Sequence, residues 1–175
     1  MAYRFTVKDY HRMAEADVFD PADRVELFDG RVYDMAPIGS RHASCVKRLA
    51  ALFPPLIGGR AILSVQDPIH LDYRSEPQPD LALLRPTPDF YAGEHPHPAD
   101  VLLMVEVAET TLEYDLLDKA PRYVLAGIPE AWVVDVVREV VHVATTDTTR
   151  AVLRGDTVAP AAFPDIVVEV AAILG

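Results

Sequence analysis

The sequence has a single cysteine, Cys45, among its 175 residues. One cysteine forms no internal disulfide, so we expect the protein to work in the reducing cytoplasm. No apolar run approaches the ~20 residues of a membrane span. The first residues, MAYRFTVKDYHRM, also lack the apolar core of a secretory signal peptide. We therefore expect no membrane partner.

Positive charge is scarce and unevenly placed. The chain has 16 Lys and Arg against 27 Asp and Glu, a net charge of −11. Residues 1–75 carry ten basic and ten acidic side chains, whereas residues 76–175 carry six and seventeen. Such a chain is not expected to bind nucleic acid unless bound cations offset clustered carboxylates, because binding depends on neutralised phosphates.

Composition and patterning are otherwise those of a soluble globular protein. Half of the residues are hydrophobic and a quarter are charged, and the length predicts one domain over residues 1–175. Short apolar runs alternate with helical patterns, which predicts an α+β fold with one mixed, mostly antiparallel sheet flanked by helices. Strands are expected at residues 61–65, 68–71, 80–84, 102–109, 131–137 and 139–145.

Helix signals are found in three segments. Thr6 and Asp9 resemble a capping box that opens a short helix, and Ser40 is a candidate cap for a helix that Pro54-Pro55 ends after Phe53. A third helix within residues 111–126 either starts at Asp118, with Pro121 in its first turn, or starts earlier and kinks at Pro121. Asp29-Gly30 predicts a hairpin turn between VELF and RVYDM. The tail, IVVEVAAIL, is either a strand or a helix.

The stretch LLMVEVAE reads as a buried strand that contains one carboxylate, Glu106. An ionised glutamate there needs a partner, because burying it alone costs several kcal/mol. Asp80 occupies a similar setting in PQPDLALL. Two acids on short hydrophobic strands suggest that the strands are neighbours in one sheet and that the two carboxylates lie close together. Carboxylates that close need a cation, because their like charges would otherwise force one of them to bind a proton. Ligation by oxygen alone favours Mg²⁺ or Mn²⁺ over zinc.

A helix after Glu106 adds a basic group. Asp115 and Lys119 are four residues apart and share a helical face if the helix already runs there. Lys119 is the only lysine after Lys47. A lysine near a metal-bound water can orient that water and stabilise negative charge on a scissile phosphate.

These residues, with Tyr123 and the segment GIPEAWVVD, resemble the small bacterial putative restriction endonucleases of the Uma type, which belong to the PD-(D/E)xK superfamily. The resemblance extends from FTVKDYHRM and VELFDGRVYDM through Asp135, and implies a restriction-endonuclease-like core. Ala108 stands where the usual lysine of the superfamily would follow the acid, and Lys119 fits that role from the helix.

The resemblance implies a metal-dependent nuclease that hydrolyses phosphodiester bonds, with DNA as the expected partner. In that role Asp80, Glu106 and the backbone carbonyl of Val107 hold Mg²⁺ or Mn²⁺, and Lys119 orients the attacking water. Three further residues match positions of the family or lie beside the site and are candidate accessory groups: Glu26, His42 and Asp115.

Structural interpretations of the same residues stay open. Glu106 can form an ion pair with Arg122 or another basic group, and Asp80 can start its strand by accepting backbone hydrogen bonds. Glu26 can pair across strands, and His42 can cap a helix. At the level of the whole chain, one alternative is a catalytically silent module that works as a homodimer or binds a partner. Another is a different Mg²⁺-dependent phosphohydrolase.

The most basic short stretch, RHASCVKR, lies on the helix expected after Ser40. Arg41 and Arg48 are two helical turns apart and share a face, with Lys47 at its edge. We expect these three side chains to contact nucleic-acid phosphates, with the helix N-terminus adding partial positive charge. The alternative is a solvated charged face.

Overall fold

A six-stranded sheet forms the centre of the computed structural model, which describes residues 2–20 and 22–175. The strand order is β3-β4-β5-β6-β7-β8, and every neighbouring pair is antiparallel except β5 and β6. The expected α+β class with a mixed, mostly antiparallel sheet is therefore confirmed. The strands are β3 Ile62–Val65, β4 Leu81–Leu84, β5 Val101–Ala108, β6 Ala131–Asp135, β7 Val140–Ala144 and β8 Thr149–Leu153.

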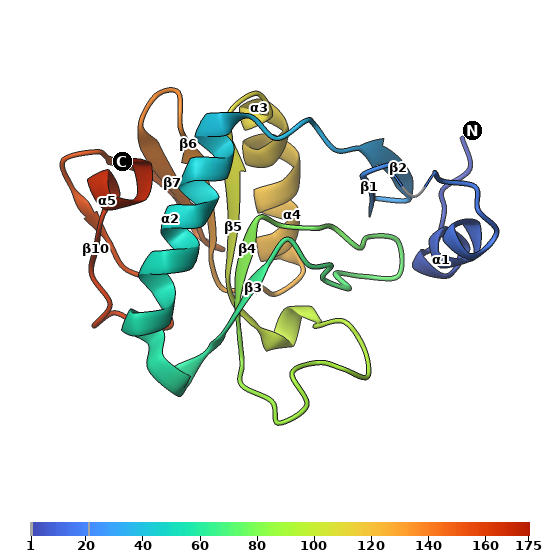
Figure 1. Ribbon diagram of the computed structural model, residues 1–175, viewed down its shortest axis with the longest axis horizontal. Helices are drawn as coiled ribbons and strands as arrows, with labels where there is room; N and C mark the ends of the chain where they lie inside the picture. Colours follow the sequence, from blue (N-terminus) through green and yellow to red (C-terminus); the bar gives the residue numbers. More distant parts are fainter. Residues whose placement is uncertain (1, 21) are drawn as a thin grey trace.

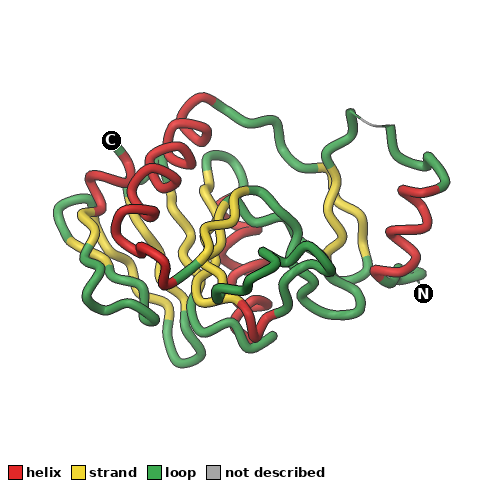
Figure 2. Tube along the Cα trace, turned by 60° about the horizontal axis from the view of Figure 1, so that its bottom comes forward, coloured by secondary structure: helices red, strands yellow, loops and turns green. Residues whose placement is uncertain are grey.

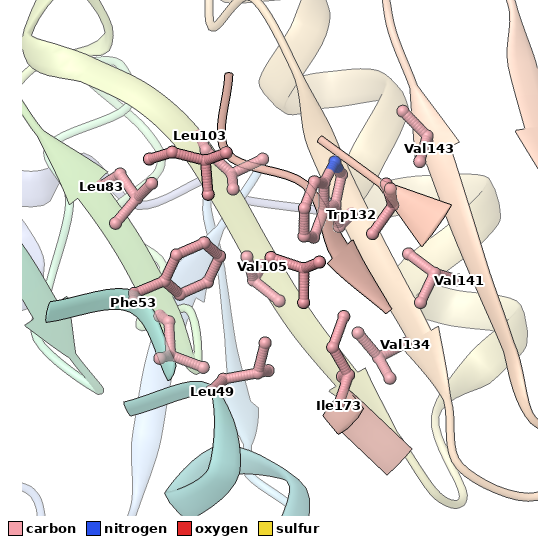
Figure 3. Close-up of a cluster of buried hydrophobic side chains, with 14 of the residues drawn as sticks. Leu49, Phe53, Leu83, Leu103, Val105, Trp132, Val134, Val141, Val143 and Ile173 are labelled. Carbon is pink, nitrogen blue, oxygen red and sulfur yellow. The ribbon is translucent and has the colours of Figure 1, made fainter. Parts of the chain in front are cut away.

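Helices cover both faces of this sheet (Figure 1). One face packs against α2 (Ser40–Ile57) and the terminal α5 (Val170–Leu174), and the other against α4 (Ala120–Leu125). On the first face, Leu49 and Phe53 of α2 meet Val105 and Trp132 of the sheet (Figure 3). All eight residues of β5 are buried, as expected for a strand covered on both sides.

The N-terminal part forms an arm at the end of the molecule opposite the C-terminus (Figures 1 and 2). It contains α1 (Val7–Glu15) and the hairpin of β1 (Val25–Phe28) and β2 (Arg31–Asp34). The expected capping box is present, because Thr6 and Asp9 exchange side chain-to-backbone hydrogen bonds. The hairpin turn is also as expected, with positive φ at its two central residues, Asp29-Gly30.

The expected bounds of α2 were wrong at both ends. Gly39 is the N-cap and has no side-chain hydrogen bond, so Ser40 does not cap the helix. The helix also continues through Pro54 and Pro55 to Ile57. Prolines retain a helical φ, and burial of Ile57 in the core holds this last turn despite the missing N–H groups. A 3-10 turn, η1 (Gly58–Arg60), follows.

The strand expected at residues 68–71 is absent from the described structure. The segment instead bonds to the turns that follow it, with the Ile69 and Leu71 N–H groups donating to the carbonyls of Pro77 and Ser75. Residues 85–97 form no helix or strand, and a 3-10 turn, η2 (Pro98–Asp100), leads into β5.

The helix of residues 111–126 starts early, as in the second of the two expected forms. It runs from α3 (Leu112–Tyr114) through a π-helical segment, η3 (Asp115–Lys119), into α4. The Ala120 N–H donates to the Asp115 carbonyl, five residues back, so the helix widens just before Pro121. The tail combines both expected types, with β9 (Thr157–Val158), β10 (Val168–Glu169) and α5. Across the described residues, no helix is long and apolar enough to span a membrane.

Candidate functional site

The pairing of β4 with β5 brings Asp80 and Glu106 together. Leu81, the first residue of β4, pairs with Val105, so continuing the register by one residue places Asp80 opposite Glu106 at the end of β4. Asp80 also accepts a hydrogen bond from the Val107 N–H at 2.8 Å. The two acids and Val107 line one cavity of about 370 Å³.

Glu106 points towards the helical segment that crosses from β5 to β6. Its Oε1 accepts hydrogen bonds from Lys119 Nζ at 3.2 Å and from the Tyr123 hydroxyl at 2.5 Å. Lys119 is therefore the basic partner of Glu106. Arg122, which was named as a candidate for that role, pairs with Asp72. Both hydrogen bonds described for Glu106 fall on Oε1.

The π-helical segment directs two side chains to the same cavity. Asp115 and Lys119 are its first and last residues, and both are buried and line the cavity. In a π-helix, with more residues per turn than an α-helix, positions i and i+4 point in nearly the same direction. Lys119 also contacts Glu26 Oε1 at 2.9 Å. The Glu26 side chain thus extends from β1 to the helix, and its ion pair forms there rather than across the hairpin.

Charge in this cavity is unbalanced. Two basic side chains besides His42 line it, Arg24 and Lys119, against six carboxyl groups: Glu26, Asp34, Asp80, Glu106, Glu109 and Asp115. Burial, reinforced by the other acids, raises the pKa of Glu106 to about 8 although Lys119 opposes the shift. Burial also raises the pKa of Asp115 to about 6.

Lys119 remains charged in this setting. Burial favours its neutral amine, but the carboxylates of Glu106, Glu26 and Asp115 outweigh burial and raise its pKa. Burial raises the pKa of Tyr123 well above its usual value, so its hydroxyl keeps the proton that it donates to Glu106.

His42 connects α2 to Asp80. Its Nε2 lies 2.9 Å from Asp80 Oδ2, and this contact raises the pKa of the imidazole against the effect of burial. Asp80 Oδ1 accepts a hydrogen bond from Gln66 at 3.1 Å. Glu109 accepts one from the His42 backbone N–H at the start of α2. His42 is therefore a partner of Asp80, and Glu109, not His42, caps the helix.

The donor chemistry fits a hard divalent cation. Asp80 and Glu106 offer carboxylate oxygens, which hard divalent cations prefer as ligands. Over residues 2–20 and 22–175, no group of three or more His, Cys, Asp and Glu side chains is arranged to hold a metal ion. A site here would thus rest on the two carboxylates, completed by main-chain and water oxygens.

The three basic residues of α2 differ in their surroundings. Arg41 and Lys47 are exposed, whereas Arg48 is half-buried and donates to the Leu174 carbonyl at 3.0 Å. Arg48 therefore holds the C-terminal helix in place.

Two parts of the site were missed by sequence analysis. Tyr123 was assigned no role in the site, yet its hydroxyl bonds to Glu106 and its side chain has no exposed surface. Gln66 was not identified at all, because a glutamine after a strand carries no signal of its own. The four-residue step from Lys119 to Tyr123 was a usable signal, since it places the tyrosine on the lysine's helical face.

Comparisons with known proteins identify a family and a fold. A family model described as Uma2, putative restriction endonuclease, matches residues 7–171. The chain is also similar to a crystal structure described as a putative nuclease belonging to DUF820 from Anabaena variabilis. The TM-score is 0.80 at 10% identity, with 97% of each chain covered, and at this identity the likeness shows the fold alone. No curated protein matches the sequence.

Proposed function

Because the chain belongs to the Uma2 family of putative restriction endonucleases, we propose that it is a divalent-metal-dependent nuclease that hydrolyses phosphodiester bonds of DNA. The observation that carries this proposal is the cavity that Asp80 and Glu106 both line beside the buried Lys119. Lys119 contacts Glu26 and Glu106 there.

In this proposal Asp80, Glu106 and the carbonyl of Val107 hold Mg²⁺ or Mn²⁺. The cation would lower the pKa of a water molecule and offset charge on the scissile phosphate. Lys119 keeps its proton, so its ammonium group orients the attacking water and stabilises charge that develops on phosphate oxygens. Tyr123 fixes Glu106 Oε1 through its hydroxyl.

The remaining groups act through these residues. His42 and Gln66 hold the two oxygens of Asp80 in position. Glu26 holds Lys119 through a second ion pair beside that with Glu106, and Asp115 adds negative charge that favours cation binding. We assign Glu26, His42 and Asp115 as accessory residues of the nuclease site.

A cleavage assay tests this function. The purified protein is incubated with supercoiled plasmid, linear duplex, single-stranded DNA and RNA, each with Mg²⁺, Mn²⁺ or EDTA. We expect cleavage of DNA with either metal and none with EDTA. Cleavage that persists unchanged in Asp80→Asn would reveal a contaminating nuclease, and no cleavage of any substrate by a folded protein would refute the proposal.

We further propose that α2 contacts DNA phosphates through Arg41, Lys47 and Arg48. Reversing Arg41 and Arg48 to glutamate should weaken DNA binding and flatten its salt dependence, because each lost phosphate contact reduces the salt slope by about one. Fluorescence anisotropy at several salt concentrations measures both, with Mg²⁺ present and the Lys119→Met substitution in every protein to suppress cleavage. Since Arg48 also holds Leu174, the variant Arg41→Glu/Lys47→Glu serves as a second test, and unchanged salt slopes in both would place the contact elsewhere.

A further inference from the structure

Arg24 is a basic side chain of the nuclease cavity to which no role has been assigned. It is exposed, immediately precedes β1 on the N-terminal arm, and lines the cavity together with Asp80 and Glu106. Five arginines form ion pairs within residues 2–20 and 22–175, and Arg24 is not one of them. Its positive charge is therefore available to a ligand that enters the cavity.

The hairpin turns Arg24 towards the cavity. The Met35 N–H donates to the Arg24 carbonyl, which extends the pairing of β1 with β2 by one residue. Because alternate residues of a strand point to the same face, Arg24 lies on the face from which Glu26 reaches Lys119. Two residues along a strand span about 7 Å, so Arg24 extends this wall of the cavity beyond Glu26.

The other two basic side chains of the cavity already have partners. Lys119 is buried and forms ion pairs with two carboxylates, and His42 Nε2 contacts Asp80. Among the lining residues, Arg24 is thus the basic side chain that no carboxylate of the described residues contacts. An incoming phosphate can pair with it without breaking an ion pair of the protein.

The N-terminus of α2, which also carries partial positive charge at the cavity, is occupied. Glu109 accepts a hydrogen bond there from the His42 backbone N–H. Gly39 leaves room for this carboxylate, because a Cβ at that position would overlap Glu109 Oε2. A substrate phosphate would have to displace Glu109 to use this helix end, so the arm is the better cationic wall.

We propose that Arg24 binds a phosphate of the substrate strand next to the phosphate that is cleaved. A guanidinium presents a fork of N–H donors that matches two phosphate oxygens, and it stays charged at every relevant pH. Lys119 is buried where the cleaved phosphate is proposed to lie, whereas Arg24 is exposed on the arm. Its partner is therefore a neighbouring phosphate of the same strand. This inference rests on the proposed function for its class of substrate.

Binding of a labelled DNA duplex, followed by fluorescence anisotropy, tests the contact with Mg²⁺ present and Lys119→Met in every protein. Arg24→Gln should bind about tenfold more weakly and lower the salt slope by about one, because one charged phosphate contact is lost. Arg24→Lys should recover the slope but only part of the affinity, since an ammonium lacks the fork. Arg31→Gln, exposed on β2 of the same arm and outside the cavity lining, should match the parent protein.

Cleavage kinetics with Lys119 intact separate binding from chemistry. Arg24→Gln should raise KM about tenfold and keep kcat within about twofold, because a contact to an unreacting phosphate is the same in the ground state and the transition state. Calorimetry should show that Arg24→Gln binds Mn²⁺ at least as tightly as the wild type, since the substitution removes positive charge from the cavity.

Two results would overturn the inference: unchanged DNA affinity and salt slope in folded Arg24→Gln, or an equal loss in Arg31→Gln, which would reveal a general effect of charge on the arm. If Arg24→Gln fails to fold, Arg24→Lys decides, and full affinity in that variant contradicts the forked contact. DNA binding that depends on Arg24 without any cleavage by the wild type refutes only the nuclease. Cleavage with an unchanged KM in Arg24→Gln refutes only the role of Arg24.

Discussion

Replacing Lys119 with methionine should lower the rate of DNA cleavage by at least about a hundredfold, in line with the loss of one preorganised donor at a developing negative charge. Methionine keeps the length of the side chain but removes the ammonium group that lies between Glu26 and Glu106. Cleavage rates at saturating Mg²⁺ measure the loss. Mn²⁺ binding should be retained, because the proposed ligands are Asp80, Glu106 and the Val107 carbonyl.

Arg150→Met, on the exposed strand β8, is a matched control that removes a positive charge far from the cavity and should cleave like the wild type. A Lys119→Met protein that binds Mn²⁺ and still cleaves DNA at the wild-type rate would contradict the catalytic role. In that case Lys119 would serve only as the ion-pair partner that makes Glu106 tolerable in its strand.

The metal-free protein should lose stability as pH rises from about 5 to about 9. The folded state holds the Glu106 proton with a pKa of about 8, raised from 4.5. The folded state therefore binds more protons than the unfolded state in this window, and stability falls as that proton is lost. Asp115, with a pKa of about 6, acts in the same direction at lower pH. Over the whole window the decrease should reach a few kcal/mol.

Urea unfolding in EDTA at several pH values measures this dependence. Glu106→Gln should flatten the profile, because a carboxamide is neutral throughout, while Asp118→Asn, an exposed neighbour of Lys119, should keep the wild-type slope. Mg²⁺ should restore stability at high pH in the wild type. Identical slopes in the wild type and Glu106→Gln would show that this carboxyl is already ionised in the folded protein at pH 5.

Much of the site's location could be predicted because burial leaves a strong pattern. A glutamate inside the run of β5 requires a partner, and an aspartate at the start of a second apolar strand is a candidate to lie near it. The hairpin and α1 were predictable for a different reason, because the Asp29-Gly30 turn and the Thr6–Asp9 capping box act locally.

Features that depend on tertiary packing were not predictable from local signals. Pro54 and Pro55 end helices in general, but burial of Ile57 continues α2 past them. Residues 68–71 have a strand-like pattern, yet they bond to the turns that follow them. The π-helical segment Asp115–Lys119 was also not predictable, because Pro121 is compatible with either start of the helix.

Calorimetric titration of the metal-free protein with Mn²⁺ tests the central claim most directly, namely that Asp80 and Glu106 share a divalent cation. The wild type should bind Mn²⁺ and, near pH 7, release a proton from Glu106, so that the heat changes with the ionisation enthalpy of the buffer. Asp80→Asn and Glu106→Gln should each bind at least about tenfold more weakly, and Asp147→Asn, on an exposed turn, should match the wild type. Wild-type protein that binds no Mn²⁺, or variants at both carboxylates that bind it as tightly as the wild type, would contradict the account.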